Sequence, residues 1–183
     1  MLPNHLEFLE RLDDLMKAAA AGERLLALIV ARVPVVSRVD ALLGYRAGDR
    51  LAEDLAQEIA RLIQPGDWVW RLDRATLACV LPSLAQPAQA WSAAYRIAHL
   101  LDQPVRAGAH ALQVPPALGL ALFPAHAAEA EALLQRATLA AEGAVHARDH
   151  VALYDPRQHE ARQRELDLQD SLQQAIAGQA LQL

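Results

Sequence analysis

The chain has 183 residues, of which 54% are hydrophobic and only 4% aromatic, so it can form one domain with a sizeable aliphatic core. Its formal net charge of −5 argues against a general nucleic-acid or anionic-membrane surface, because such surfaces need concentrated positive charge. A single cysteine, Cys79, excludes an internal disulfide and a multi-cysteine metal site.

The sequence shows no apolar run of about 18 residues and no signal peptide. We therefore expect this part of the protein to be soluble and cytoplasmic, with no segment that inserts directly into a membrane. Cys79 falls within a predicted strand, which favours a small buried side chain over a reactive thiol.

Helices and strands alternate along the chain. In the first part, Asn4 can cap a helix, Pro34 closes an apolar strand, and Gly44 separates two helices. The predicted elements of this part are a helix over 4–20, a strand over 25–33, and helices over 35–43 and 47–63. The strand is apolar almost throughout, which predicts burial on both of its faces.

The second part begins with a predicted β-hairpin, whose strands over 67–72 and 76–81 flank a short polar turn. Because a hairpin is antiparallel, the pattern indicates an α/β sandwich of the ferredoxin-like kind, with a central, mainly antiparallel sheet flanked by helices. The remaining predicted elements are a helix over 88–101, strands over 105–114 and 117–123, a helix over 127–144, a strand over 151–154, and a polar helix over 157–183.

Several segments match one known family in order and spacing. They are Leu2-Pro3-Asn4, LGYRAGD over 43–49, Pro65-Gly66-Asp67, the two flanks of the hairpin over 71–82, and ALGLALFP over 117–124. Over residues 2–156 the chain therefore resembles the GGDEF (diguanylate cyclase) family, which implies that family's fold.

The C-terminal tail resembles the connector into an EAL (cyclic-di-GMP phosphodiesterase) domain, although an ordinary terminal helix is the alternative. We expect a GGDEF-like domain over 1–156 and a linker helix over 157–183. The resemblance implies a longer GGDEF–EAL tandem protein.

The five family signature positions, G-G-D-E-F, hold Asp73, Arg74, Ala75, Thr76 and Leu77 here, and we name these residues the signature segment. The resemblance implies that the third and fourth positions supply a metal ligand and an acidic partner, which Ala75 and Thr76 do not provide. It also implies that the two glycines let the turn approach phosphate closely, whereas Asp73 and Arg74 add bulk and a negative charge. The signature segment is therefore degenerate.

The resemblance places another magnesium-binding carboxylate at the end of the first strand, where this chain has Arg32. A guanidinium cannot bind Mg²⁺, which needs oxygen ligands. The phosphate-contacting lysines of the family fall at Ser37 and near Val145, and neither residue is basic. We therefore expect no metal site, no catalytic residue and no cyclase activity.

The family recognises guanine with an Asn and an Asp, and these positions hold Asp40 and Asp49. Asp49 could accept from guanine N1–H and N2–H₂, whereas Asp40 offers acceptors only. The favoured interpretation of Asp49 is a carboxylate that caps the following helix, and guanine binding is the alternative. We expect no cofactor and at most weak GTP binding, unless Arg32, Arg46 or Arg74 supplies a phosphate contact.

Two further features lie at the hairpin. The family's inhibitory cyclic-di-GMP site has the pattern R-x-x-D; Asp67 matches the Asp, but Gln64 replaces the Arg and provides neither bidentate phosphate binding nor stacking. Trp68 and Trp70 lie on one face of a strand. Core filling is the favoured interpretation, and the alternatives are filling of a vacated pocket or a partner surface.

The first hypothesis is an inactive regulatory domain that transmits signals or forms a homodimer or another protein contact next to an EAL domain of the same parent chain. The second is a GTP-binding sensor that activates the linked phosphodiesterase without turnover. A third, an active cyclase with an unconventional site, conflicts with the missing carboxylates. Nucleic acid is not an expected partner.

Overall fold

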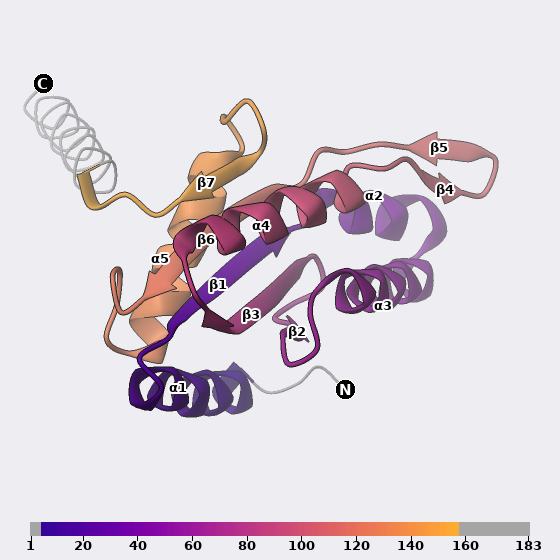
Figure 1. Cartoon of the computed structure of the whole chain (residues 1–183). Coiled ribbons are helices and arrows are strands. Elements are labelled where there is room, and N and C mark those ends of the chain that lie inside the picture. Colours follow the sequence, from indigo (N-terminus) through magenta and orange to yellow (C-terminus); the bar gives the residue numbers. More distant parts are fainter. Residues whose placement is uncertain (1–4, 158–183) are drawn as a thin grey trace, which may run out of the picture.

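The computed structural model describes residues 5–157, and Figure 1 shows how their helices and strands are arranged. The predicted cap at Asn4 and, apart from Arg157, the predicted helix over 157–183 lie outside the described residues. In chain order the elements are α1 (His5–Ala21), β1 (Leu25–Arg32), α2 (Pro34–Leu43), α3 (Tyr45–Leu62), β2 (Trp68–Arg71), β3 (Thr76–Leu84), α4 (Pro87–Leu101), β4 (Val105–Ala107), β5 (His110–Leu112), β6 (Ala117–Phe123), α5 (Ala130–Ala144) and β7 (Val151–Leu153).

The centre of the fold is a five-stranded sheet in the order β2-β3-β1-β6-β7. Strand β1 pairs antiparallel with β3 and β6, and β2 pairs antiparallel with β3. Only the β6–β7 pair in this sheet is parallel. The prediction of a mainly antiparallel sheet flanked by helices is confirmed.

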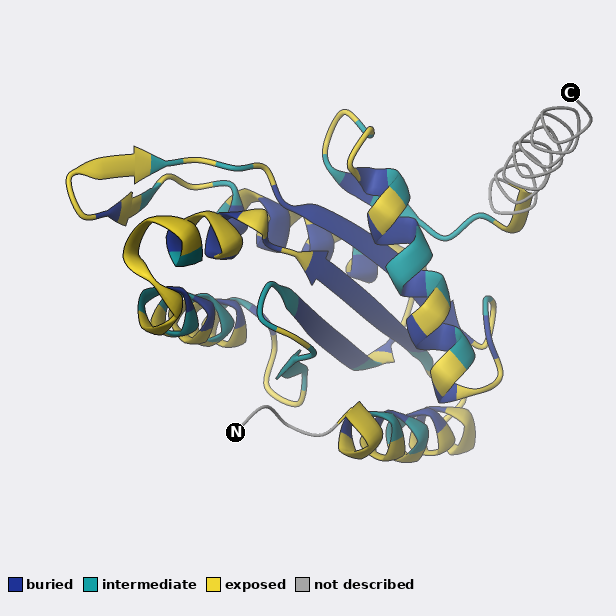
Figure 2. Cartoon of the chain, turned by 180° about the vertical axis from the view of Figure 1, so that it is seen from behind, coloured by how far each residue is buried: buried dark blue, intermediate teal, exposed yellow. Residues whose placement is uncertain are grey.

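Strand β1 is buried on both faces, as its apolar sequence predicts. Successive side chains point to opposite faces, so Ile29 joins the core beneath α3 and α4, whereas Leu28 joins the core beneath α1 and α5. Figure 2 shows that β1, β3 and β6 are almost entirely buried between these helical layers. Cys79 of β3 lies in this core, and burial raises the pKa of its thiol to about 12.

The prediction of one strand over 105–114 is wrong. The segment instead forms a separate hairpin of β4 and β5, which projects beyond the main sheet (Figure 1). The chain reverses at Gly108, whose φ of +62° is a left-handed conformation that glycine adopts without strain.

Other boundaries differ by a few residues. Helix α3 begins at Tyr45 rather than 47, and α5 begins at Ala130 rather than 127. Strand β3 continues past its predicted end because a β-bulge accommodates Pro82: Leu25 pairs with Leu84, but Ala27 pairs with Leu81. No helix among residues 5–157 has both the length and the apolar character needed to cross a membrane.

Candidate functional site

The signature segment begins in the turn between β2 and β3 and continues into β3. The turn closes when Leu72 N–H donates to the Thr76 carbonyl at 3.0 Å. Asp73 Oδ1 accepts from the backbone N–H of Ala75 at 2.8 Å. The Asp73 carboxylate is therefore used to hold its own turn, which is a common role of aspartate in loops.

The turn is fixed to the end of the central strand. The backbone N–H of Val33, directly after β1, donates to the Ala75 carbonyl at 2.7 Å. Strand β1 brings Arg32 opposite Thr76 on one side and Ala117 on the other. The structure thus places the three predicted metal-site positions, Arg32, Ala75 and Thr76, side by side, as the resemblance implies.

These residues do not fit a magnesium ion. Mg²⁺ in proteins prefers carboxylate oxygens, and none of the three side chains is a carboxylate. Within residues 5–157, no group of three or more His, Cys, Asp or Glu side chains is arranged to hold a metal. The shallow cavity here, about 470 Å³, is bordered by the cation of Arg32 as well as by Asp73 and Glu142.

Arg74 points away from this cavity and into the corner between α2 and α3. Its Nε–H and Nη2–H donate to the two carboxylate oxygens of Asp40 at 3.2 and 3.0 Å. This two-pronged contact is the geometry in which arginine and a carboxylate bind most specifically. The Asp40 side chain is only 11% exposed, so this ion pair is largely shielded from solvent on the carboxylate side.

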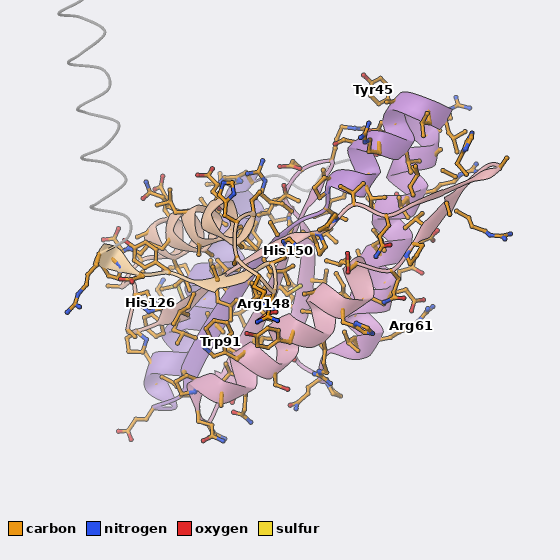
Figure 3. The ribbon with its side chains drawn as sticks, turned by 90° about the horizontal axis from the view of Figure 1, so that it is seen from above. Tyr45, Arg61, Trp91, His126, Arg148 and His150 are labelled. Atoms are coloured by element: carbon orange, nitrogen blue, oxygen red, sulfur yellow. The ribbon has the colours of Figure 1, made fainter. Side chains whose placement is uncertain are left out.

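Tyr45 completes the contact with Arg74. The backbone carbonyl of Tyr45 accepts from Arg74 Nη2 at 3.2 Å, and the guanidinium carbon lies 4.7 Å from the centre of the tyrosine ring. Such cation–π contacts favour a flat guanidinium over other donors. Figure 3 shows Tyr45 at the rim of the molecule, at the start of α3, where its ring is largely exposed.

Asp49 binds two arginines. Its Oδ1 atom lies 2.6 Å from Arg71 Nη2 and 3.2 Å from Arg74 Nη1. The hydrogen bond from Arg71 is the main cause that lowers the pKa of Asp49 below its ordinary value, so this carboxylate is ionised at neutral pH. The interpretation of Asp49 as a helix cap is wrong, because α3 begins four residues earlier and its N-cap, Gly44, makes no side-chain capping bond.

Gly48 makes room for this arrangement. A Cβ atom at Gly48 would lie 1.9 Å from Asp40 Oδ1, far closer than any real contact. The glycine in α3 therefore lets the Asp40 carboxylate lie directly against the helix backbone. Two predicted guanine-binding positions, Asp40 and Asp49, are thus brought together, but both face an arginine of the chain.

The structure also shows where the residues lie that replace the family's phosphate-contacting lysines and its inhibitory cyclic-di-GMP site. Ser37 lies on an exposed part of α2, and Val145, directly after α5, is 51% exposed. Asp67 Oδ2 accepts from the backbone N–H of Gln64 at 2.9 Å, and burial raises the pKa of Asp67. The pair at the predicted inhibitory position thus forms a local turn contact.

The two tryptophans of β2 pack on the opposite side of the sheet from Arg74. Their rings lie 5.0 Å apart, and Trp70 also contacts Phe8 of α1, with 6.0 Å between ring centres. The guanidinium of Arg11 lies 5.3 Å from the Trp68 ring. The core interpretation of this pair agrees with the structure, because both rings pack against the core beneath α1 and α5.

The sequence alone did not reveal the pairing of Arg71 and Arg74 with the two carboxylates. One signal was present: an Asp stands where the family has a neutral Asn, and an Arg stands in the facing turn where the family has Gly. A new negative charge and a new positive charge at facing positions indicate an ion pair.

Comparisons with known proteins agree with this fold. Residues 1–150 match the family model described as "Diguanylate cyclase, GGDEF domain". The chain is 29% identical over 140 residues to Diguanylate cyclase TpbB of Pseudomonas aeruginosa, which covers 76% of this chain and 32% of that protein. It is 23% identical over 186 residues to the Bifunctional diguanylate cyclase/cyclic di-GMP phosphodiesterase MucR of the same species, covering 100% of this chain and 27% of that protein.

A solved structure shows the same fold. The crystal structure of the TpbB GGDEF domain matches with a TM-score of 0.75 and 29% identity, covering 84% of this chain and 97% of that one. The chain spans only about a third or less of the length of the two curated relatives. The match over residues 1–150 shows that this chain belongs to the GGDEF-domain family of diguanylate cyclases.

Proposed function

We propose that this GGDEF domain is catalytically inactive and acts in cyclic-di-GMP signalling by interaction or dimerisation next to an EAL phosphodiesterase domain. The observation that carries the proposal is the position of Arg74. This residue of the signature segment binds Asp40 and Asp49, the two side chains at the family's guanine-binding positions.

The reaction of a diguanylate cyclase explains why these changes matter. In such an enzyme the 3′-hydroxyl of one GTP attacks the α-phosphate of another and displaces pyrophosphate. A carboxylate-bound Mg²⁺ would offset the phosphate charge and assist the attacking oxygen. Arg32, Ala75 and Thr76 supply no carboxylate for that ion. The relative TpbB is named a diguanylate cyclase, but these substitutions argue against carrying that activity over to this chain.

An EAL neighbour is supported by the second relative. MucR, named as both a cyclase and a phosphodiesterase, aligns with the full length of this chain, including residues 157–183. In a longer protein with such a domain, we expect removal of residues 1–156 to change phosphodiesterase activity without removing a source of cyclic-di-GMP.

The alternative is a GTP sensor that activates the linked phosphodiesterase without turnover. Its support is that Asp40 and Asp49 lie at one site. GTP would have to displace Arg74 there, and Ser37 and Val145, which stand at the family's lysine positions, would not offset its phosphate charge. Calorimetric titration with GTP and Mg²⁺ separates the two proposals, because saturable binding favours the sensor.

An inactive domain forms no product from GTP. Purified domain incubated with GTP and either Mg²⁺ or Mn²⁺ is expected to form no cyclic-di-GMP that mass spectrometry detects. Loss of metal assistance removes several kcal/mol of transition-state stabilisation, a decrease of about 10³-fold or more in rate.

The TpbB GGDEF domain, assayed under the same conditions, serves as the matched comparison. Cyclic-di-GMP that accumulates linearly with time and with the concentration of this domain would overturn the proposal of an inactive domain.

A further inference from the structure

The polar atoms that bind the Arg74 guanidinium are hydrogen-bond acceptors. They are the two carboxylate oxygens of Asp40, Oδ1 of Asp49 and the backbone carbonyl of Tyr45. The Tyr45 ring covers one face of the same group. We name Asp40, Asp49 and Tyr45 the acceptor site.

We propose that the acceptor site selects an alkylguanidinium cation instead of a guanine base, and that Arg74 is its built-in ligand. The inference rests on the proposed function, since it takes the site as one that no longer processes GTP. It goes further by naming the class of ligand that the site recognises.

Hydrogen-bond chemistry supports this choice of ligand. A guanidinium is flat and carries only N–H donors, so every edge of it can face an acceptor. A guanine base places the acceptor O6 beside N1–H and N2–H₂ on the same edge. At the acceptor site that oxygen would meet a carboxylate that cannot donate, because Asp40 stands where an amide would offer N–H.

Charge supports the same conclusion. Arg71 stays bound to Asp49 at 2.6 Å and offsets one of the two carboxylates. With the Arg74 side chain removed, Asp40, Asp49 and Arg71 together carry a net charge of −1, from two carboxylates and one guanidinium. A monovalent cation neutralises that charge, whereas a nucleotide adds several negative charges.

The fit is geometric as well as electrostatic. Asp40 is 11% exposed and is held against α3 at Gly48, so its two oxygens are fixed in position before any ligand arrives. The Arg74 side chain is 39% exposed, so a soluble ligand can reach its place when the side chain is shortened. A planar, forked donor gains more from fixed acceptors than a point charge does.

The test is chemical rescue of Arg74→Ala, with binding of ethylguanidinium measured by calorimetry and by the shift in Tm. We expect saturable ethylguanidinium binding that is at least about tenfold tighter than binding of the matched cation ethylammonium, because ammonium lacks the fork. Guanosine monophosphate is expected not to bind, and Arg74→Ala combined with Asp40→Ala is expected to lose ethylguanidinium binding. Wild-type protein, whose site is filled, is the negative control.

Two results would overturn the inference: no preference of folded Arg74→Ala for ethylguanidinium over ethylammonium, or tighter binding of guanosine monophosphate than of ethylguanidinium. If Arg74→Ala does not fold by circular dichroism, Arg74→Gln replaces it with the same expected order of ligands. Either result is distinct from failure of the proposed function. The proposed function fails only if the wild-type domain produces cyclic-di-GMP.

Discussion

Replacement of Gly119 by alanine is expected to lower the free energy of unfolding by about 3 kcal/mol or more, at the upper end of overpacking effects. Gly119 lies in β6, where α5 packs directly on the strand. A Cβ atom there would lie 2.1 Å from both the Ala137 carbonyl oxygen and the Ala141 nitrogen. These are backbone atoms, so no rotation of a side chain relieves the contact, and α5 has to move away from the sheet.

The matched control is Gly143→Ala in α5 itself. No atom lies within 4 Å of a Cβ built at Gly143, and alanine favours a helix by up to about 1 kcal/mol over glycine. Urea denaturation of both variants checks the prediction. If Gly119→Ala lowers the free energy of unfolding by less than about 1 kcal/mol, the close packing of β6 against α5 is contradicted. If Gly143→Ala also lowers the free energy of unfolding, it does not serve as a matched control.

The second large effect is expected at Phe8, which holds α1 on the sheet. Phe8 has no exposed surface and packs against Trp70 of β2. Truncation of a buried phenylalanine to alanine removes its apolar contacts and leaves a cavity, at a cost of about 3–5 kcal/mol. We expect Phe8→Ala to lower the free energy of unfolding by this amount.

Leu42→Ala provides the control for Phe8→Ala. Leu42 is 54% exposed on α2, so its truncation is expected to change stability by no more than about 0.5 kcal/mol. The same urea titrations measure both variants. Equal losses for Phe8→Ala and Leu42→Ala would mean that α1 is not an integral part of the core.

Much of the fold follows from local sequence patterns. The run over 25–33 predicts a strand buried on both faces because Arg32 is its only polar residue. Alternate side chains of β1 do enter different halves of the core. The hairpin around the signature segment is predicted by a polar turn between two apolar strands. These patterns report burial and backbone reversal, which are largely local properties.

The errors arise where one residue changes the path of the backbone. The segment around Gly108 is apolar enough for one strand, but the positive φ of that glycine turns it into a hairpin. Pro82 looks like the end of a strand, yet a bulge lets β3 continue through it. Composition does not distinguish these outcomes, because the first depends on the backbone conformation of one glycine and the second on pairing with the distant strand β1.

In the candidate site, too, the sequence predicts which residues lie together but not which of them bind each other. The resemblance identifies Asp40, Asp49 and the signature segment as the residues to compare, and the fold brings them together. The resemblance does not predict which of the nearby arginines contacts which carboxylate. That choice depends on the distance between the β2–β3 turn and the α2–α3 corner, and on the space that Gly48 leaves for Asp40.

The central claim is that Arg74, and not a nucleotide, occupies the site in the native domain. The most direct test is NMR observation of the Arg74 Nε–H resonance, assigned by its loss in Arg74→Ala, during titration of the wild-type domain with GTP and Mg²⁺. We predict that this resonance stays at its position, because the guanidinium remains bound to Asp40 and Asp49. A saturable shift with GTP that ATP does not produce would contradict the account and favour a nucleotide sensor.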